Sequence, residues 1–300
     1  MFEKNIKNIK KHFSENGIFY TPKEDAEKLT KFIDVKFDEV YDPTCGQGNL
    51  LSVFGDEIKK YGQELDAAEL EKAKQSLKNF QGYSGDTLSD DKFKGRQFDL
   101  IMANPPFSVK WEQLPYDERF KVCELAPKSK ADWAFNLHIL YHLKENGQAI
   151  VLNFPGTAYR GNAEQKIRKY FIDNNFIDKV ICYPPNTFVD TKISTIVYIF
   201  KKNKKTTDVV FIDETGKEKA VKQSEIVEND YNLSVSTYIE QYVEKEKVDI
   251  DIINKQVADG LLSQIRSFLK LESIQSDVGD LGISYLKSEL QKILNEKEVI

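Results

Sequence analysis

The sequence predicts an α/β protein with a doubly wound, mostly parallel sheet, helices on both of its faces and a C-terminal helical extension. Two observations lead to this expectation. Over residues 39–200, short apolar runs of strand length alternate with longer segments of helical spacing, a pattern typical of parallel sheets. We expect the run 194–200 to close the sheet. From Val248 onward, apolar residues form a long stripe at helical spacing instead.

The composition excludes several classes of protein. The chain has 300 residues, enough for one large domain or for one domain with an appendage. It contains no apolar run of about 18 residues, so we expect no membrane span. Its N-terminus lacks the apolar core of a signal peptide. Cys45, Cys123 and Cys182 are odd in number and scattered, which favours a reducing cytoplasm and argues against a disulfide framework or a zinc site.

The net charge of the chain indicates whether it could hold DNA alone. The net charge is −5, whereas a protein that holds DNA alone usually carries a basic excess, because phosphate contacts dominate affinity. Basic residues cluster only locally, at 4–11 and 201–205, where a solvated surface is the simpler interpretation.

His138 and His142 lie four residues apart on a predicted helix, with no acidic or thiolate residue spaced to join them. We interpret them as packing residues and expect no metal site.

The first 35 residues are expected to form a helical N-terminal segment. A short amphipathic helix is predicted over 3–15. A second helix follows Tyr20, because Thr21 can N-cap it and Pro22 suits its first position.

A glycine-containing turn follows a short predicted strand at 39–41. The segment reads Asp42-Pro43-Thr44-Cys45-Gly46-Gln47-Gly48-Asn49-Leu50-Leu51 and leads into an apolar helix. Its glycines would let the backbone approach a ligand closely. The third glycine position of a dinucleotide fingerprint holds Leu51 instead, so no phosphate is implied. A tight strand–helix turn without a ligand is the alternative interpretation.

Two further predicted strands end in acidic residues. Glu64 lies about 20 residues beyond Asp42, where a carboxylate can accept hydrogen bonds from both hydroxyls of a ribose. Asp66 is an alternative for that role, or it caps the helix predicted over 67–79. Asp86 ends the strand that follows, and its alternative interpretation is a loop residue in a glycine-rich turn.

The apolar run 98–103 predicts a buried strand that two prolines end abruptly. Asn104 is therefore left at a strand's carboxyl end, the edge where open α/β sheets bind ligands. The amide carbonyl and a backbone carbonyl of Asn104-Pro105-Pro106-Phe107 could accept from an amino group beside a flat apolar ring. A plain strand-terminating turn is the alternative.

The tetrapeptide at 104–107 resembles the Asn-Pro-Pro-aromatic motif of amino-methyltransferases that methylate adenine N6 in DNA. The segment 42–50 looks like their S-adenosylmethionine motif. The order of the motifs over 17–240 resembles that of the modification (M) subunit of type I restriction–modification systems. The resemblance implies a Rossmann-like methyltransferase sheet, S-adenosyl-L-methionine as cofactor and DNA as substrate. The implied activity is that of a site-specific, adenine-specific DNA methyltransferase.

The resemblance also assigns the site residue by residue. The catalytic residues would be Asn104, Pro105, Pro106 and Phe107. The cofactor would be bound by Tyr20, Thr21, Pro22, Asp42, Thr44, Cys45, Gly46, Gly48, Asn49, Leu50, Glu64, Leu65, Asp86, Thr87 and Asn104. Phe107 and Phe188 would lie against the flipped base, although a core position for Phe188 is equally compatible with the sequence. Carbonyls that accept both amine hydrogens would free the nitrogen lone pair for attack on the sulfonium methyl.

Two departures from the family pattern shape the expected partners. Only a short segment precedes Asp42, where such subunits carry a large helical domain, and no target-recognition domain is evident. We therefore expect a separate specificity (S) subunit to dock on the C-terminal helices and to select the DNA sequence, with an endonuclease subunit as a further partner. Methylation of RNA or of a protein glutamine, and a catalytically silent protein that binds S-adenosylmethionine, are the alternative functions.

The chain is thus expected to divide into four parts: an N-terminal helical segment (1–35), a methyltransferase core (36–206), a hairpin and connecting segment (207–245) and a pair of C-terminal helices (246–300). The expected location is the cytoplasm.

Overall fold

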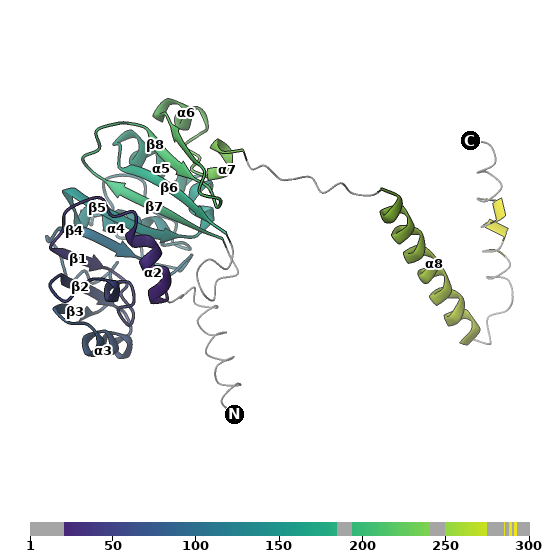
Figure 1. Ribbon diagram of the computed structural model, residues 1–300, viewed down its shortest axis with the longest axis horizontal. Helices are drawn as coiled ribbons and strands as arrows, with labels where there is room; N and C mark the ends of the chain where they lie inside the picture. The colour runs from purple at the N-terminus through teal and green to yellow at the C-terminus, as the bar shows by residue number, and fades with distance from the viewer. Residues whose placement is uncertain are drawn as a thin grey trace. The chain divides into compact units, whose positions relative to one another are not determined.

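The computed structural model describes residues 21–184, 194–240 and 250–274, together with Tyr285, Ser288, Glu289, Gln291 and Lys292. The chain divides into two compact units, Met1–Gln241 and Tyr242–Ile300, which are described separately (Figure 1). The helix predicted over 3–15 and the site residues Tyr20 and Phe188 lie outside the described residues.

A nine-stranded sheet forms the centre of the first unit, in the order β3-β2-β1-β4-β5-β7-β6-β8-β9 (Figure 1). The strands are β1 (Glu39–Asp42), β2 (Lys59–Glu64), β3 (Phe80–Ser84), β4 (Phe98–Ala103), β5 (Leu143–Asn153), β6 (Ile177–Tyr183), β7 (Thr195–Lys201), β8 (Val209–Ile212) and β9 (Glu218–Val221). The first five pair in parallel, and β7 lies antiparallel between β5 and β6. The predicted doubly wound, mostly parallel sheet is confirmed.

The sheet continues beyond the strand that was expected to close it. β8 pairs in parallel with β6, with Val180 opposite Phe211, and β9 adds an antiparallel strand outside β8. The expectation that the run 194–200 closes the sheet was therefore wrong. A four-residue apolar run such as β8 does not encode which distant strand it joins, because pairing depends on the connection between them.

Helices cover both faces of this sheet (Figure 1). They are α2 (Lys23–Thr30), α3 (Ala67–Ser76), α4 (Asp132–His142), α5 (Ala163–Asp173), α6 (Gln223–Glu228) and α7 (Val235–Tyr238), with short 3₁₀ turns η1 (Leu51–Val53) and η2 (Pro155–Ala158). Side chains of β4 alternate between the faces: Leu100 packs with α3, whereas Ile101 packs in the cluster that holds Trp133 of α4 and Phe171 of α5.

The parallel arrangement determines where a ligand site can form. β1, β2, β4 and β5 run in the same direction, so their carboxyl ends meet at one edge of the sheet. Asp42 and Glu64 are the last residues of β1 and β2, and Asn104 directly follows β4. Residues far apart in the sequence are thereby brought to a single edge.

The second unit contains α8 (Ile250–Ile274), which matches the predicted apolar stripe. Ile252, Val257, Leu261 and Leu262 are all more than half exposed on it. The second helix predicted in this region is helical at each of its described residues, from Tyr285 to Lys292. In the described ranges no helix combines the length and hydrophobicity that a membrane crossing requires.

Candidate functional site

A cavity of about 510 Å³ opens at the carboxyl edge of the sheet. It is lined by thirteen of the residues predicted for the site: Thr21, Asp42, Thr44, Cys45, Gly46, Asn49, Leu50, Glu64, Leu65, Asp86, Thr87, Asn104 and Pro106. The glycine turn after β1, the acids after β2 and β3 and the proline motif after β4 therefore contribute to one site.

Four predicted residues do not line this cavity: Pro22, Gly48, Pro105 and Phe107. Pro22 precedes α2 as its N-cap residue, and Pro105 is buried. Gly48 has a φ of +86°, and a Cβ there would lie 2.5 Å from Leu77 Cδ1. Gly48 is thus needed where the turn packs against the end of α3, away from the cavity.

Ten further residues line the cavity: Pro43, Gln47, Asp66, Glu69, Gly85, Leu88, Val109, Lys110, Trp111 and Phe135. Of these, Asp66 was predicted only as an alternative to Glu64 or as a helix cap. Trp111 lies in the loop that follows the proline motif. Its indole Nε1 donates to Pro127 O at 3.0 Å, and its ring packs on Phe120 with centroids 5.1 Å apart. A tryptophan in that loop could have indicated a cavity residue. The direction of the Trp111 side chain, however, depends on how the loop folds back on itself.

Asp42 is almost fully buried at the end of β1, with 1% of its surface exposed. Its Oδ1 accepts from Thr44 N at 2.9 Å and so shapes the turn that follows. Burial raises the pKa of the Asp42 carboxyl to about 8, and the Thr44 N–H opposes this shift. Burial also raises the pKa of the neighbouring Cys45 thiol well above its usual range, so Cys45 acts as a packing residue and not as a nucleophile.

Both carboxylate oxygens of Glu64 are held by backbone groups. Oε2 accepts from Gly46 N at 2.8 Å, and Oε1 accepts from Asp66 N at 3.0 Å. Asp66 caps α3, with its Oδ1 accepting from Ala68 N at 2.8 Å. The side chain of Asp66 is therefore used by the helix, whereas Glu64 is fixed between the glycine turn and the end of β2.

The segment that carries Asp86 and Thr87 is fixed from two sides. Asp86 accepts from Leu88 N at 3.0 Å, and the Thr87 hydroxyl donates to Pro43 O. Arg119, from the loop after the proline motif, donates to Thr87 O at 2.8 Å and to Leu88 O at 2.6 Å. The walls that follow β3 and β4 are thus joined through one buried side chain.

Asn104 meets Thr21 across the cavity wall. Its Nδ2 donates to Thr21 Oγ1 at 3.0 Å, although the two residues are 83 positions apart. Asn104 also shares the cavity lining with Gly46. The end of β4 and the start of α2 therefore meet beside the glycine turn.

A buried polar cluster lies next to this site, and it corrects the sequence-based account of the histidines. Asp91 joins them: its Oδ2 lies 3.0 Å from His142 Nε2. One ligand atom from each of Asp91, His138 and His142 lies within 4.8 Å of the others. Arg119 Nη1 contacts His138 Nδ1 at 2.9 Å and lies 3.7 Å from Asp91 Oδ2, which disfavours a metal cation there. Burial lowers the pKa of His138 well below its ordinary value.

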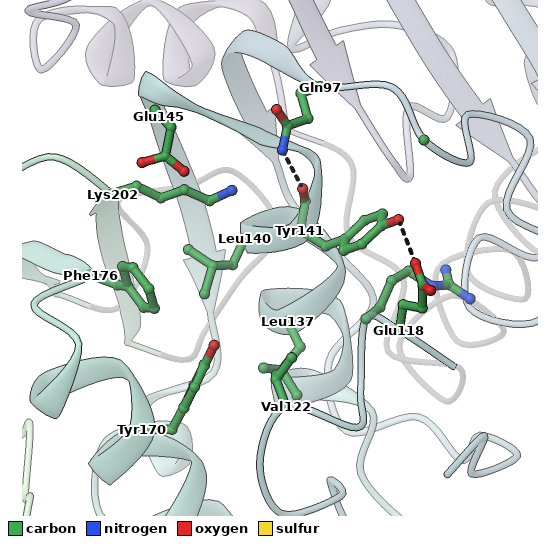
Figure 2. Close-up of a pocket in the computed structure, with 12 residues that line it drawn as sticks. Gln97, Glu118, Val122, Leu137, Leu140, Tyr141, Glu145, Tyr170, Phe176 and Lys202 are labelled. Carbon is green, nitrogen blue, oxygen red and sulfur yellow. Dashed lines mark hydrogen bonds between the residues drawn. The ribbon is translucent and has the colours of Figure 1, made fainter. Parts of the chain in front are cut away.

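A second cavity of about 460 Å³ lies at the amino ends of β4, β5 and β6. Figure 2 shows its walls, with Glu145 and Lys202 on one side and Tyr141 and Glu118 on the other. None of the predicted site residues lines it. The carboxyl-edge cavity is therefore the candidate functional site.

The chain also matches a known protein family. The model of a family described as N-6 DNA Methylase matches residues 1–223 of the 300. The chain belongs to the N-6 DNA methylase family.

Methylase subunits of type I restriction enzymes resemble it over most of its length. The MpnII methylase subunit of a type I restriction enzyme from Mycoplasma pneumoniae is 31% identical over 87% of this chain and 60% of its own length. The MjaVII methylase subunit from Methanocaldococcus jannaschii is 28% identical over 92% of this chain and 57% of its own. The chain thus spans less than two thirds of these relatives.

The fold is shared with a solved structure. The crystal structure of the methyltransferase subunit of a type I restriction–modification system from Streptococcus thermophilus superposes with a TM-score of 0.67 at 33% identity. The match covers 74% of this chain and 59% of that one.

Proposed function

We propose that the protein transfers a methyl group from S-adenosyl-L-methionine to N6 of adenine in DNA, as the catalytic subunit of a type I-like restriction–modification system. The observation that carries this proposal is the single cavity lined by Asp42, Glu64 and Asn104. The glycine turn, proposed to hold the cofactor, and the proline motif, proposed to accept the amine, both line this cavity. Membership of the N-6 DNA methylase family and the names of the relatives support the same reaction.

The residues of the cavity fit the proposed cofactor. Its volume of about 510 Å³ falls within the roughly 300–1,000 Å³ typical of small-molecule sites. Glu64 would accept from the ribose hydroxyls and Asp86 from the adenine amino group. Asp42 would lie near the amino group, and Thr21 at the start of α2 would meet the methionyl carboxylate.

The proline motif would act by position and electrostatics. When bound, S-adenosylmethionine supplies an electrophilic sulfonium methyl. The Asn104 amide oxygen and a motif backbone carbonyl would accept the two hydrogens of the adenine amine, and Phe107 would stack on the extruded base. The motif would thereby direct the amine lone pair at that methyl group, and the surplus amine proton would leave to solvent.

Sequence selection is proposed to come from a partner. The net charge of −5 is low for a protein that holds DNA alone. The exposed stripe of α8 would dock on a specificity subunit, which would supply target recognition. An endonuclease subunit would complete the system, and action on cellular DNA would place the assembly in the cytoplasm.

The decisive test measures transfer of a labelled methyl group to DNA, with and without a candidate specificity subunit. We expect label in N6-methyladenine only in the combined reaction. Asn104→Ala should abolish transfer while leaving S-adenosylmethionine affinity nearly unchanged. Absence of label in DNA, with label instead in RNA or protein, would overturn the proposal.

A further inference from the structure

We propose that Asp132, paired with Arg160, is a positioning residue that holds the turn after Asn104-Pro105-Pro106-Phe107 in its working conformation. The inference rests on the proposed function. Ser108, the residue directly after the motif, has a φ of +53°. A non-glycine residue in this left-handed region costs about 1–3 kcal/mol and persists only when its surroundings hold it.

Asp132 provides that support as the first residue of α4. Its Oδ1 accepts from Ser108 N at 3.1 Å. The Asp132 side chain is only 2% exposed, so this bond forms out of contact with water, where a hydrogen bond to a charged group is stronger. A second bond, from Ala131 N to Val109 O at 2.9 Å, continues the same connection. The chain after the motif is therefore bound to the start of α4.

Arg160 holds the other side of this turn. Its Nη2 donates to Ser108 Oγ at 3.3 Å, and its Nη1 lies 3.6 Å from Asp132 Oδ2. Asp132 Oδ2 is buried and accepts no hydrogen bond from the described residues. Arg160 is thus the cation that offsets its charge. Arg160 Nη1 also donates to Glu164 Oε1 at 3.4 Å, which fixes the guanidinium between two buried carboxylates.

The backbone around Arg160 is shaped to receive its side chain. A Cβ on Gly156 would lie 2.6 Å from Arg160 Nε, so the glycine leaves the space that the guanidinium fills. Arg168 donates to Arg160 O at 2.7 Å and to Thr157 O at 3.1 Å, which anchors this loop to α5. The start of α4 and the loop that carries Arg160 therefore meet at Ser108, and α5 holds that loop in place.

The consequence concerns the direction of the chain after the motif. With Ser108 held in the left-handed region, Val109, Lys110 and Trp111 turn back to line the cavity. Without the Asp132 bond, Ser108 would relax toward ordinary φ values, and the motif carbonyls would lose their fixed direction. Such a misplacement lowers turnover without removing any group that touches the cofactor.

The experiment combines Asp132→Ala, Asp132→Asn and Ser108→Gly with the double variant Asp132→Ala/Ser108→Gly. Hydrogen–deuterium exchange at the Ser108 amide reports the turn directly and does not depend on activity. We expect Asp132→Ala to lose protection there and to lower kcat for methyl transfer by about 10- to 100-fold, with S-adenosylmethionine affinity retained. Asp132→Asn keeps an acceptor oxygen and should preserve most of the protection.

The double variant separates positioning from general damage. Glycine adopts a positive φ without strain, so Ser108→Gly should restore part of the kcat that Asp132→Ala loses. Asp173→Ala, in an exposed pair with Lys169 on α5, is the control for loss of a helix carboxylate. Unchanged exchange at Ser108 in Asp132→Ala, or a double variant as impaired as Asp132→Ala, would overturn the inference. Wild-type protein that protects Ser108 yet methylates no DNA would instead contradict the proposed function alone.

Discussion

Asp42 and Glu64 end neighbouring strands, yet their carboxylates lie in different surroundings. Asp42 is buried and accepts one backbone hydrogen bond, from Thr44. Glu64 accepts from two backbone N–H groups that come from different loops. Burial disfavours the charged form of Asp42. Replacing the two carboxylates should therefore have different effects.

The Asp42 carboxyl should make stability depend on pH. Its pKa is raised from 3.8 to about 8, so between these values the folded state holds a proton that the unfolded state has released. The stabilisation that this proton contributes is fully present below pH 3.8. It falls by at most about 1.4 kcal/mol per pH unit as pH rises, and it is lost once pH passes the folded-state pKa of about 8. Urea unfolding from pH 5 to 8 should show Asp42→Asn gaining stability relative to wild type as pH rises.

Asp56→Asn provides the comparison for this measurement. The hydrogen bond from Lys78 lowers the pKa of the exposed Asp56. Asp56→Asn should therefore not gain stability relative to wild type as pH rises. A constant difference between Asp42→Asn and wild type across the range would show that Asp42 is ionised in the folded state.

Glu64→Gln should weaken S-adenosylmethionine binding by about 10- to 100-fold, because hydrogen bonds to a charged group contribute about 1.5–3 kcal/mol. The amide nitrogen of glutamine would also face one of the two backbone donors, Gly46 N or Asp66 N. Titration calorimetry measures the effect. Glu71→Gln, on the solvent side of α3, is the matched control and should bind normally. Equal affinities for the two variants would remove Glu64 from the cofactor site.

At the scale of elements, the turn between β1 and η1 depends on its second glycine. Gly48 and Gly216 share a φ of +86°. A Cβ added at Gly48 would lie 2.5 Å from Leu77 Cδ1, whereas one added at Gly216 would have no neighbour within 4 Å. Alanine at either position should cost about 1–2 kcal/mol for the left-handed conformation. Gly48→Ala should cost about 1–3 kcal/mol more from overpacking against α3.

Chemical denaturation of the two variants measures this difference directly. Because Gly48 packs on α3 and does not line the cavity, any loss of cofactor affinity in Gly48→Ala would report displacement of the whole turn. Equal destabilisation by the two substitutions would show that Leu77 moves aside freely.

Strands and motifs could be predicted from the sequence to different extents. The apolar run of β4 and its proline stop locate Asn104 at a strand end, because both signals are local. The glycine turn is equally local. Trp111 and Phe135 could not be assigned to the cavity, because their directions follow from a long loop and from the packing of α4. Asp91 reaches His142 from 51 positions away, and no spacing rule anticipates that contact.

At the scale of the whole molecule, the second unit offers an exposed apolar stripe. Val257 and Leu261 lie one turn apart on α8 and are 55% and 56% exposed. Val257→Asp/Leu261→Asp should lower affinity for a candidate specificity subunit by more than about tenfold, because burying an unpaired carboxylate costs several kcal/mol. Co-purification and titration measure the loss, with S-adenosylmethionine affinity as the check on the first unit.

Gln256→Asp/Ser263→Asp adds the same two charges to another side of α8 and serves as the control. Retained binding by the stripe variant, or equal loss by both, would contradict docking through the stripe.

Arg119 has a consequence for how the cavity adapts to a ligand. A guanidinium carries five N–H groups, and in Arg119 they donate to Asp117, Thr87 O, Leu88 O and His138. With these donors engaged inside the protein, Arg119 has none left to donate to a DNA phosphate. Because Arg119 also links Thr87 O and Leu88 O, after β3, to the loop after β4, we expect these two walls of the cavity to adjust to a bound ligand together.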